Sequence, residues 1–145
     1  MTPPRLVPVP SSGAPALPLF LYGTLKPGEV RWFALEGRTI GQPRHAEVPG
    51  RLYDTGWGYP AWVPADDGVV PGVVLALDPL TAAAAWAEVC DIEGGVEGEY
   101  APVETCTLDG EAVLAFPYHL PPGAPVPEGF RRIVAWHHGP VPLDG

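Results

Sequence analysis

Short apolar runs separated by glycine and proline make up most of the chain. The run 19–22 (LFLY) is wholly apolar, and the run 72–78 (GVVLALD) is rich in β-branched residues. Continuous apolar runs of this length are typical of strands that are buried on both faces. Segments 50–56 and 59–65 place aromatic and branched residues between turn formers, and are predicted as further strands.

One segment has the composition of a long helix. Residues 79–95 (PLTAAAAWAEVCDIEGG) contain four consecutive alanines, which favour a helix, and Gly94 and Gly95 are expected to end it. Shorter helical patterns occur at 31–37 and, as a closing helix, at 128–139.

A hairpin is predicted after the long helix. Asp109 and Gly110 form a strong turn signal between the strand-like segments 100–108 and 111–120. Many strands, one long helix and no β-α-β alternation predict an α+β fold, with a small mixed barrel-like sheet, one main helix and short flanking helices.

The two ends of the chain differ from its middle. Residues 1–17 are rich in proline and serine and show no helical or strand period, which predicts a flexible leader. Residues 139–145 resemble a tail, so the single folded domain is expected to span 18–138.

The composition of the chain argues against some classes of binding partner. The chain has 145 residues and a formal net charge of −9, which argues against nucleic acid or an anionic membrane surface as a partner. No apolar run approaches the roughly 20 residues of a membrane helix, and prolines make the N-terminus a poor signal peptide. Cys90 and Cys106 do not make a disulfide scaffold, so a cytoplasmic protein with free thiols is expected.

Glu93 is the first candidate for chemistry. It falls in the last turn of the predicted helix, where the helix dipole disfavours a carboxylate. Glu88 and Asp91 are near it in sequence, and this acidic crowding is expected to raise the pKa of one member, more so if that member is buried. A carboxylate with a raised pKa suits a general base near neutral pH, whereas the alternative is that all three acids simply face solvent.

The turn that follows the first strand is the second candidate. Gly23, Thr24 and Leu25 end the 19–22 run, and amide N–H groups exposed there can bind a carboxylate or a developing oxyanion. An ordinary strand-to-loop bend is the simpler alternative. We refer to these three residues below as the 23–25 turn.

Other chemistries have less support. No histidine stands at a metal-ligand spacing from another ligand type, so no metal or cofactor is expected, and the pair His137 and His138 is expected to be exposed. The chain has no GxSxG motif, and the neighbours of Cys90 would not lower its pKa. Trp57 and Trp62 could line a pocket instead of filling the core.

Four segments, in order, resemble the γ-glutamylcyclotransferase-like family, which includes the AIG2-like proteins. They are YGTLKPG (22–28), GRLYDTGWGYPA (50–61), VPGVVLAL (70–77) and VCDIEGGVEGEY (89–100). The chain departs from the family pattern at Val89-Cys90, where the family has Leu-Asp, and at Ala101-Pro102, where basic residues are common.

The resemblance implies an activity and a set of site residues. The free α-amine of a γ-glutamyl group attacks its own γ-carbonyl, which closes the 5-oxoproline ring and releases an amine. The family's catalytic glutamate corresponds to Glu93, and the tyrosine after it to Tyr100. The 23–25 turn would hold the γ-glutamyl group, and Tyr22, Tyr59 and Pro60 would form the walls of the pocket.

Several alternatives remain open from sequence. The small-molecule substrate could be a γ-glutamyl amino acid, glutathione, a γ-glutamyl-ε-lysine isopeptide or a γ-glutamyl-protected natural product, and the acidic protein slightly favours γ-glutamyl amines. A non-catalytic module could use the same cavity to bind a metabolite or partner. In a purely structural interpretation, Gly23 and Glu93 are incidental. The sequence predicts no particular oligomeric state.

Overall fold

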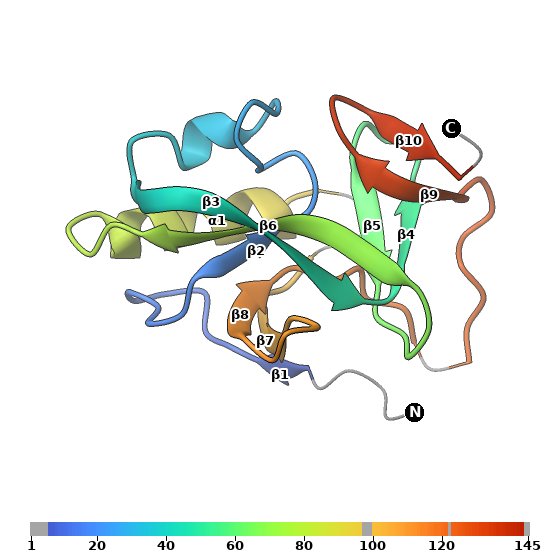
Figure 1. Cartoon of the computed structure of the whole chain (residues 1–145), viewed down its shortest axis with the longest axis horizontal. Coiled ribbons are helices and arrows are strands. Elements are labelled where there is room, and N and C mark those ends of the chain that lie inside the picture. The colour runs from blue at the N-terminus through green and yellow to red at the C-terminus, as the bar shows by residue number, and fades with distance from the viewer. Residues whose placement is uncertain (1–5, 97–99, 122, 144–145) are drawn as a thin grey trace.

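The chain forms two β-sheets and one main helix (Figure 1). The computed structural model describes residues 6–96, 100–121 and 123–143. The elements are β1 (Val7–Pro8), β2 (Leu19–Leu21), the 3₁₀ helix η1 (Trp32–Ala34), β3 (Thr39–Pro49), β4 (Arg51–Asp54), β5 (Pro60–Val63), β6 (Val69–Leu77), α1 (Ala82–Gly94), β7 (Val103–Cys106), β8 (Ala112–Ala115), β9 (Arg131–Trp136) and β10 (Pro140–Pro142).

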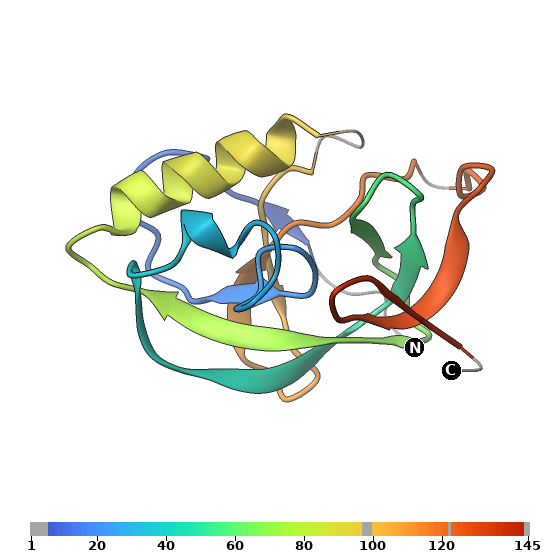
Figure 2. The same ribbon diagram turned by 90° about the horizontal axis from the view of Figure 1, so that it is seen from above.

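The larger sheet has six strands in the order β1-β7-β8-β2-β6-β3. Its pairs are antiparallel except for β2 and β8, which run parallel with Leu19 opposite Leu114. Figure 2 shows α1 and η1 on one side of this sheet, while β3 and β6 extend from beneath α1 to the smaller sheet. That sheet has four strands in the order β10-β9-β4-β5.

Gly50 joins the two sheets. It lies between β3 and β4 with a φ of 143°, a backbone conformation that favours glycine. A Cβ atom at this position would lie 2.8 Å from the carbonyl oxygen of Val63. The chain therefore turns from one sheet into the other at a residue without a side chain, which brings β5 and its first residue, Pro60, towards the end of β2.

Strand β2 is buried on both faces, as its continuous apolar run predicts. Leu19 and Leu21 belong to the core beneath α1, while Phe20 and Tyr22 belong to the core between the two sheets. Successive side chains of a strand point to opposite faces, so one short strand contributes to both cores. The 23–25 turn consequently emerges where the two cores meet.

Most of the predicted elements are present. The 50–56 and 59–65 segments contain β4 and β5, and the 79–95 segment contains α1. Strand β6 covers most of the 72–78 segment but begins earlier, at Val69. The Asp109-Gly110 turn joins the antiparallel strands β7 and β8, which confirms the hairpin. The fold is α+β with one main helix, but its strands form two open sheets, so closure into a barrel is unconfirmed.

The predicted closing helix at 128–139 is wrong. Residues 131–136 form strand β9, which pairs with β4 and places Ile133 opposite Leu52. Ile133 and Trp136 are the buried residues of this strand, and their spacing of three also suits a helix.

Both chain ends contain strands that the sequence analysis missed. In the predicted leader, β1 pairs with β7, and Trp86 Nε1 donates a 3.0 Å hydrogen bond to the carbonyl oxygen of Pro10. In the predicted tail, β10 pairs with β9. Some predicted segments lie partly outside the described residues. These parts are residues 1–5 of the predicted leader, 97–99 of the VCDIEGGVEGEY segment and 144–145 of the predicted tail.

Cys90 and Cys106 are both free thiols. Within the described ranges, no helix has the length and apolar character needed to cross a membrane.

Candidate active site

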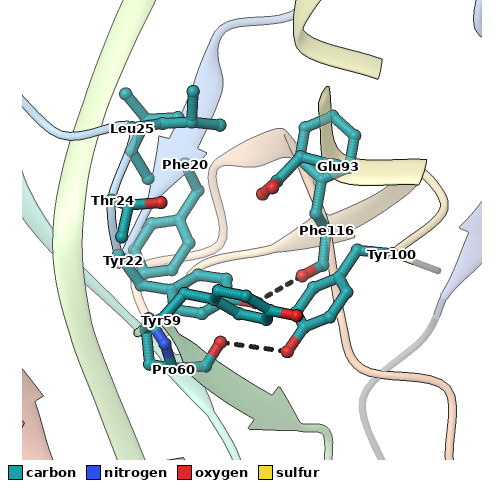
Figure 3. A pocket seen from close by; sticks show the side chains of 11 residues that line it. Phe20, Tyr22, Thr24, Leu25, Tyr59, Pro60, Glu93, Tyr100 and Phe116 are labelled. Carbon is teal, nitrogen blue, oxygen red and sulfur yellow. Dashed lines mark hydrogen bonds between the residues drawn. The ribbon is translucent and has the colours of Figure 1, made fainter. Parts of the chain in front are cut away.

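One cavity collects the residues that the sequence predicts for the site. It lies between the end of β2, the C-terminal end of α1 and the start of β5, and has a volume of about 20 Å³ (Figure 3). Its lining comprises Phe20, Leu21, Tyr22, Gly23, Thr24, Leu25, Tyr59, Pro60, Glu93, Tyr100 and Phe116. All eight predicted site residues are among them, and Phe20, Leu21 and Phe116 are additions from the structure.

Two carbonyl groups of the 23–25 turn accept hydrogen bonds from backbone amides that follow in the chain. The carbonyl oxygen of Gly23 accepts from the Lys26 amide at 3.2 Å, and that of Thr24 accepts from the Arg31 amide at 2.8 Å. Among the described residues, the amides of Thr24 and Leu25 donate to no backbone acceptor. These N–H groups are therefore available as donors at the edge of the cavity.

Gly23 is required by a close contact. A Cβ atom at this position would lie 2.8 Å from Cγ of Pro60, which is closer than real Cβ contacts. The glycine thus allows the end of β2 to approach β5, so that Pro60 forms a wall of the cavity beside the turn. Glycine is needed at position 23 because the Pro60 ring leaves no space for a side chain there.

Gly23→Ala is expected to destabilise the protein by about 1–3 kcal/mol, because the new methyl group must displace the Pro60 ring in a packed region. Thermal or urea unfolding measures this change. The matched control is Gly94→Ala, because a Cβ atom at Gly94 in α1 meets nothing within 4 Å. Equal unfolding free energies for Gly23→Ala and the wild type would contradict the assigned packing role.

Glu93 faces the turn from the opposite wall. It lies in the last turn of α1, and its carboxyl group points across the cavity towards Thr24 and Leu25 (Figure 3). Burial raises the pKa of the Glu93 carboxyl to about 7, against a smaller lowering by the positive charge of Arg31. A carboxyl group with this pKa can accept and return a proton near neutral pH.

The cause of the raised pKa differs from the expected one. The neighbouring acids point elsewhere: Asp91 is exposed, and Glu88 forms a 2.8 Å ion pair with Arg38. Desolvation of Glu93 in the cavity, not crowding by acids, raises its pKa.

Three tyrosines surround the cavity and are fixed by contacts of their own. The Tyr22 hydroxyl donates to the carbonyl oxygen of Phe116 at 2.5 Å, and the Tyr100 hydroxyl donates to that of Pro60 at 3.1 Å. The Tyr59 and Tyr100 rings meet edge to face, with centroids 6.0 Å apart. Burial is the main cause that raises the pKa of both Tyr22 and Tyr100, so both hydroxyls stay protonated.

Tyr100→Phe is expected to lower stability by about 1 kcal/mol and to change turnover far less than a substitution of Glu93. The lost hydroxyl leaves the buried Pro60 carbonyl without its donor. In the described structure Tyr100 is joined to Glu93 by a backbone hydrogen bond, from the Tyr100 amide to the Glu93 carbonyl at 3.0 Å, which the substitution leaves intact. Unfolding curves and initial rates on one preparation check this. A loss of turnover as large as that of Glu93→Gln would instead make Tyr100 a catalytic group.

Arg31 lies beside the cavity, outside its lining, and sequence analysis did not single it out. It lies just before η1, half-buried, with Cζ 5.1 Å from the centroid of the Tyr59 ring. Its guanidinium also donates to the Thr24 hydroxyl at 3.3 Å. Eight residues separate Arg31 from the 19–22 run, and no motif marked it, so only the path of the loop places it beside the turn.

A second polar cluster lies outside this cavity. The side chains of Glu29, His137 and His138 place one ligand-type atom each within 4.8 Å of one another. The Glu29 carboxylate accepts the His138 amide at 3.0 Å, and Lys26 Nζ donates to the carbonyl oxygen of Trp136. These contacts join the loop after the 23–25 turn to the β9–β10 hairpin. Residue spacing could not reveal them because Glu29 and His138 are distant in sequence.

Cys90 does not provide a nucleophile. The thiol is buried on α1, and burial, together with the nearby negative charge of Glu93, raises its pKa to about 12. At neutral pH it is therefore a protonated core side chain, as expected from its sequence neighbours.

Comparison with known proteins gives one family match and several similar folds. A family model described as "Gamma-glutamyl cyclotransferase, AIG2-like" matches residues 19–136. No curated protein sequence gives a significant match.

Three solved structures are similar over most of their length. An AIG2-like protein from Mus musculus is 18% identical, with a TM-score of 0.55 over 83% of this chain and 88% of its own. The uropathogenic E. coli-specific protein c4763 is 20% identical, with a TM-score of 0.58 over 81% and 87%. The uncharacterized protein PH0828 from Pyrococcus horikoshii is 20% identical, with a TM-score of 0.55 over 82% and 86%. At these identities the likeness concerns the fold.

Proposed function

Since the chain belongs to the gamma-glutamyl cyclotransferase, AIG2-like family, we propose that it is an enzyme that converts the γ-glutamyl group of a γ-glutamyl amine or peptide into 5-oxoproline and releases the free amine. The observation that carries the proposal is the position of Glu93, whose carboxyl group faces the 23–25 turn across one cavity. Family membership supports the class of reaction, and this geometry supports the assignment of roles.

The proposed reaction needs little beyond proton transfer. The Glu93 carboxylate takes a proton from the substrate's α-ammonium group, and the freed amine attacks the γ-carbonyl carbon. The tetrahedral intermediate collapses as its bond to the leaving nitrogen breaks, and the protonated Glu93 returns its proton to that nitrogen. The ring nitrogen loses its second proton to solvent, which gives the neutral lactam of 5-oxoproline. One carboxyl group thus acts first as base and then as acid.

Proximity within the substrate explains the small number of catalytic groups. Both reacting atoms belong to one γ-glutamyl group, and closing a five-membered ring of this kind can correspond to effective molarities of about 10⁵ M or more. The remaining requirement is stabilisation of the negative charge that develops on the γ-carbonyl oxygen. The free amides of Thr24 and Leu25 are the proposed donors for that oxygen.

The cavity must widen when substrate enters. Its volume of about 20 Å³ is enough for about one water molecule, whereas a γ-glutamyl group is several times larger. Tyr59 and Arg31 lie against each other at the side of the cavity and are the proposed moving part, because Arg31 is only half-buried.

The free thiols Cys90 and Cys106 support the expected cytoplasmic setting for this activity.

A substrate panel tests the proposal. Purified protein is incubated with γ-glutamyl amino acids, glutathione, γ-glutamyl-ε-lysine and simple γ-glutamyl amines, and 5-oxoproline and the free amine are quantified together. Equal amounts of both products from at least one compound are expected. If no compound is converted while 5-oxoproline still binds, the protein is instead a binding module on this fold.

A further inference from the structure

Arg31 forms no ion pair with a carboxylate within 4.0 Å among the described residues, although its charge acts on Glu93 from a longer distance. Four other arginines pair with carboxylates within 3.5 Å, in the pairs Arg38–Glu88, Arg44–Glu111, Arg51–Asp67 and Arg131–Asp54, whereas Arg132 also has no ion pair among the described residues. Arg31 instead contacts the Tyr59 ring and the Thr24 hydroxyl. A half-buried guanidinium held in this way keeps N–H donors and its charge for another anion.

The position of Arg31 links it to both sides of the cavity. Its backbone amide donates to the Thr24 carbonyl at 2.8 Å, which ties it to the middle of the 23–25 turn. Its charge is also the one that acts on Glu93 and on Tyr100, in both cases favouring the ionised form. Arg31 therefore lies near the turn and near the base at once.

We propose that Arg31 binds the α-carboxylate of the γ-glutamyl group, and that the enzyme therefore requires substrates in which this carboxylate is free. The inference rests on the proposed function. The α-amine and the α-carboxylate are attached to the same carbon atom, so an amine placed at Glu93 puts the carboxylate within a few ångströms of it. The guanidinium group of Arg31 is a cation that contacts two residues of the cavity lining, Tyr59 and Thr24. The amides of the 23–25 turn then remain for the γ-carbonyl oxygen.

Carboxylate binding would also help the base to act. In the free protein the charge of Arg31 favours ionised Glu93. A bound carboxylate offsets that charge, so the proton affinity of Glu93 rises when substrate is present. Glu93 thus becomes a stronger base when the α-ammonium group must lose its proton.

Ligand binding tests the inference without turnover. Calorimetry compares 5-oxoproline with its neutral isostere 5-oxoprolinamide on the wild type, Arg31→Gln and Arg31→Lys. The wild type is expected to prefer the carboxylate by at least about tenfold, as a charge-assisted pair implies. This preference should fall to about one in Arg31→Gln and be partly kept in Arg31→Lys. Arg38→Gln, which changes an arginine paired with Glu88 on the surface, should behave as the wild type.

A second comparison uses rates. A γ-glutamyl amine and the same compound with its α-carboxylate converted to carboxamide are compared by kcat/KM. The wild type should favour the carboxylate by at least about tenfold, and Arg31→Gln should lose this ratio. The acidic limb of the Arg31→Gln pH profile should move to higher pH, because the cation that favours ionised Glu93 is gone.

The outcomes separate this inference from the proposed function. An undiminished carboxylate preference in folded Arg31→Gln, or no preference in the wild type, overturns the role of Arg31 even if 5-oxoproline is formed. An Arg31-dependent preference in binding without turnover of any γ-glutamyl compound supports the role of Arg31 and refutes the cyclising activity.

Discussion

Glu93→Gln is expected to lower the rate of 5-oxoproline release by about 10²–10⁴-fold, the usual contribution of a general acid-base group. The amide keeps the shape of the side chain but cannot accept the proton of the α-ammonium group. KM should change little, because the substituted atom acts on a proton and does not anchor the substrate. Initial rates measured with a substrate identified in the panel provide the test.

Folding of the variant should be preserved. Burial raises the pKa of Glu93, so the carboxylate becomes progressively less favourable in the folded protein as pH rises from the unfolded value towards 7. Removing it should therefore leave the protein at least as stable as the wild type above pH 7. Asp91→Asn is the matched control, because Asp91 belongs to the same helix turn but is exposed. Wild-type rates in Glu93→Gln would exclude this residue as the base.

The pH dependence of kcat/KM should follow the ionisation of Glu93. The base must be ionised in the free enzyme, and its pKa is about 7, so log kcat/KM should rise with a slope of one below pH 7 and level off above it. At pH 5 the value should be about 100-fold below the plateau, as follows from two pH units at unit slope. A carboxylate with an ordinary pKa would instead leave the rate nearly constant down to about pH 5.

Rates must be compared over a pH range in which the protein remains folded, and circular dichroism at each pH provides that control. A flat profile from pH 5 to 8 would show that burial does not govern the base, and would contradict the assignment of Glu93 to a desolvated site.

The sequence predicts the buried part of this fold well and the exposed part poorly. Strand β2 is recognisable because both of its faces are covered, which leaves an uninterrupted apolar run. Strand β3 has no such pattern, because most of its residues from Thr39 to Val48 face solvent and its pairing with β6 shifts register between Ile40 and Arg44. Strand β9 is misread because its two buried residues are three apart.

The site shows the same division. Glu93 can be identified from sequence because Gly94 and Gly95 mark the end of the helix. The 23–25 turn can be identified because a glycine and a threonine interrupt the apolar run of the strand. Their meeting in one cavity depends on the Gly23–Pro60 contact and on the corner at Gly50, neither of which can be derived from spacing. Arg31 lies in a loop without a local signal, so its place beside Tyr59 is visible only in three dimensions.

Product analysis in H₂¹⁸O tests the cyclisation most directly. A substrate from the panel is converted to completion, and the mass of the acidic product is measured by mass spectrometry. If the α-amine attacks the γ-carbonyl, the product is 5-oxoproline without ¹⁸O, because water is not a reactant. Glutamate that carries one ¹⁸O atom would mean that water attacks the carbonyl, and Glu93 would then serve a hydrolase.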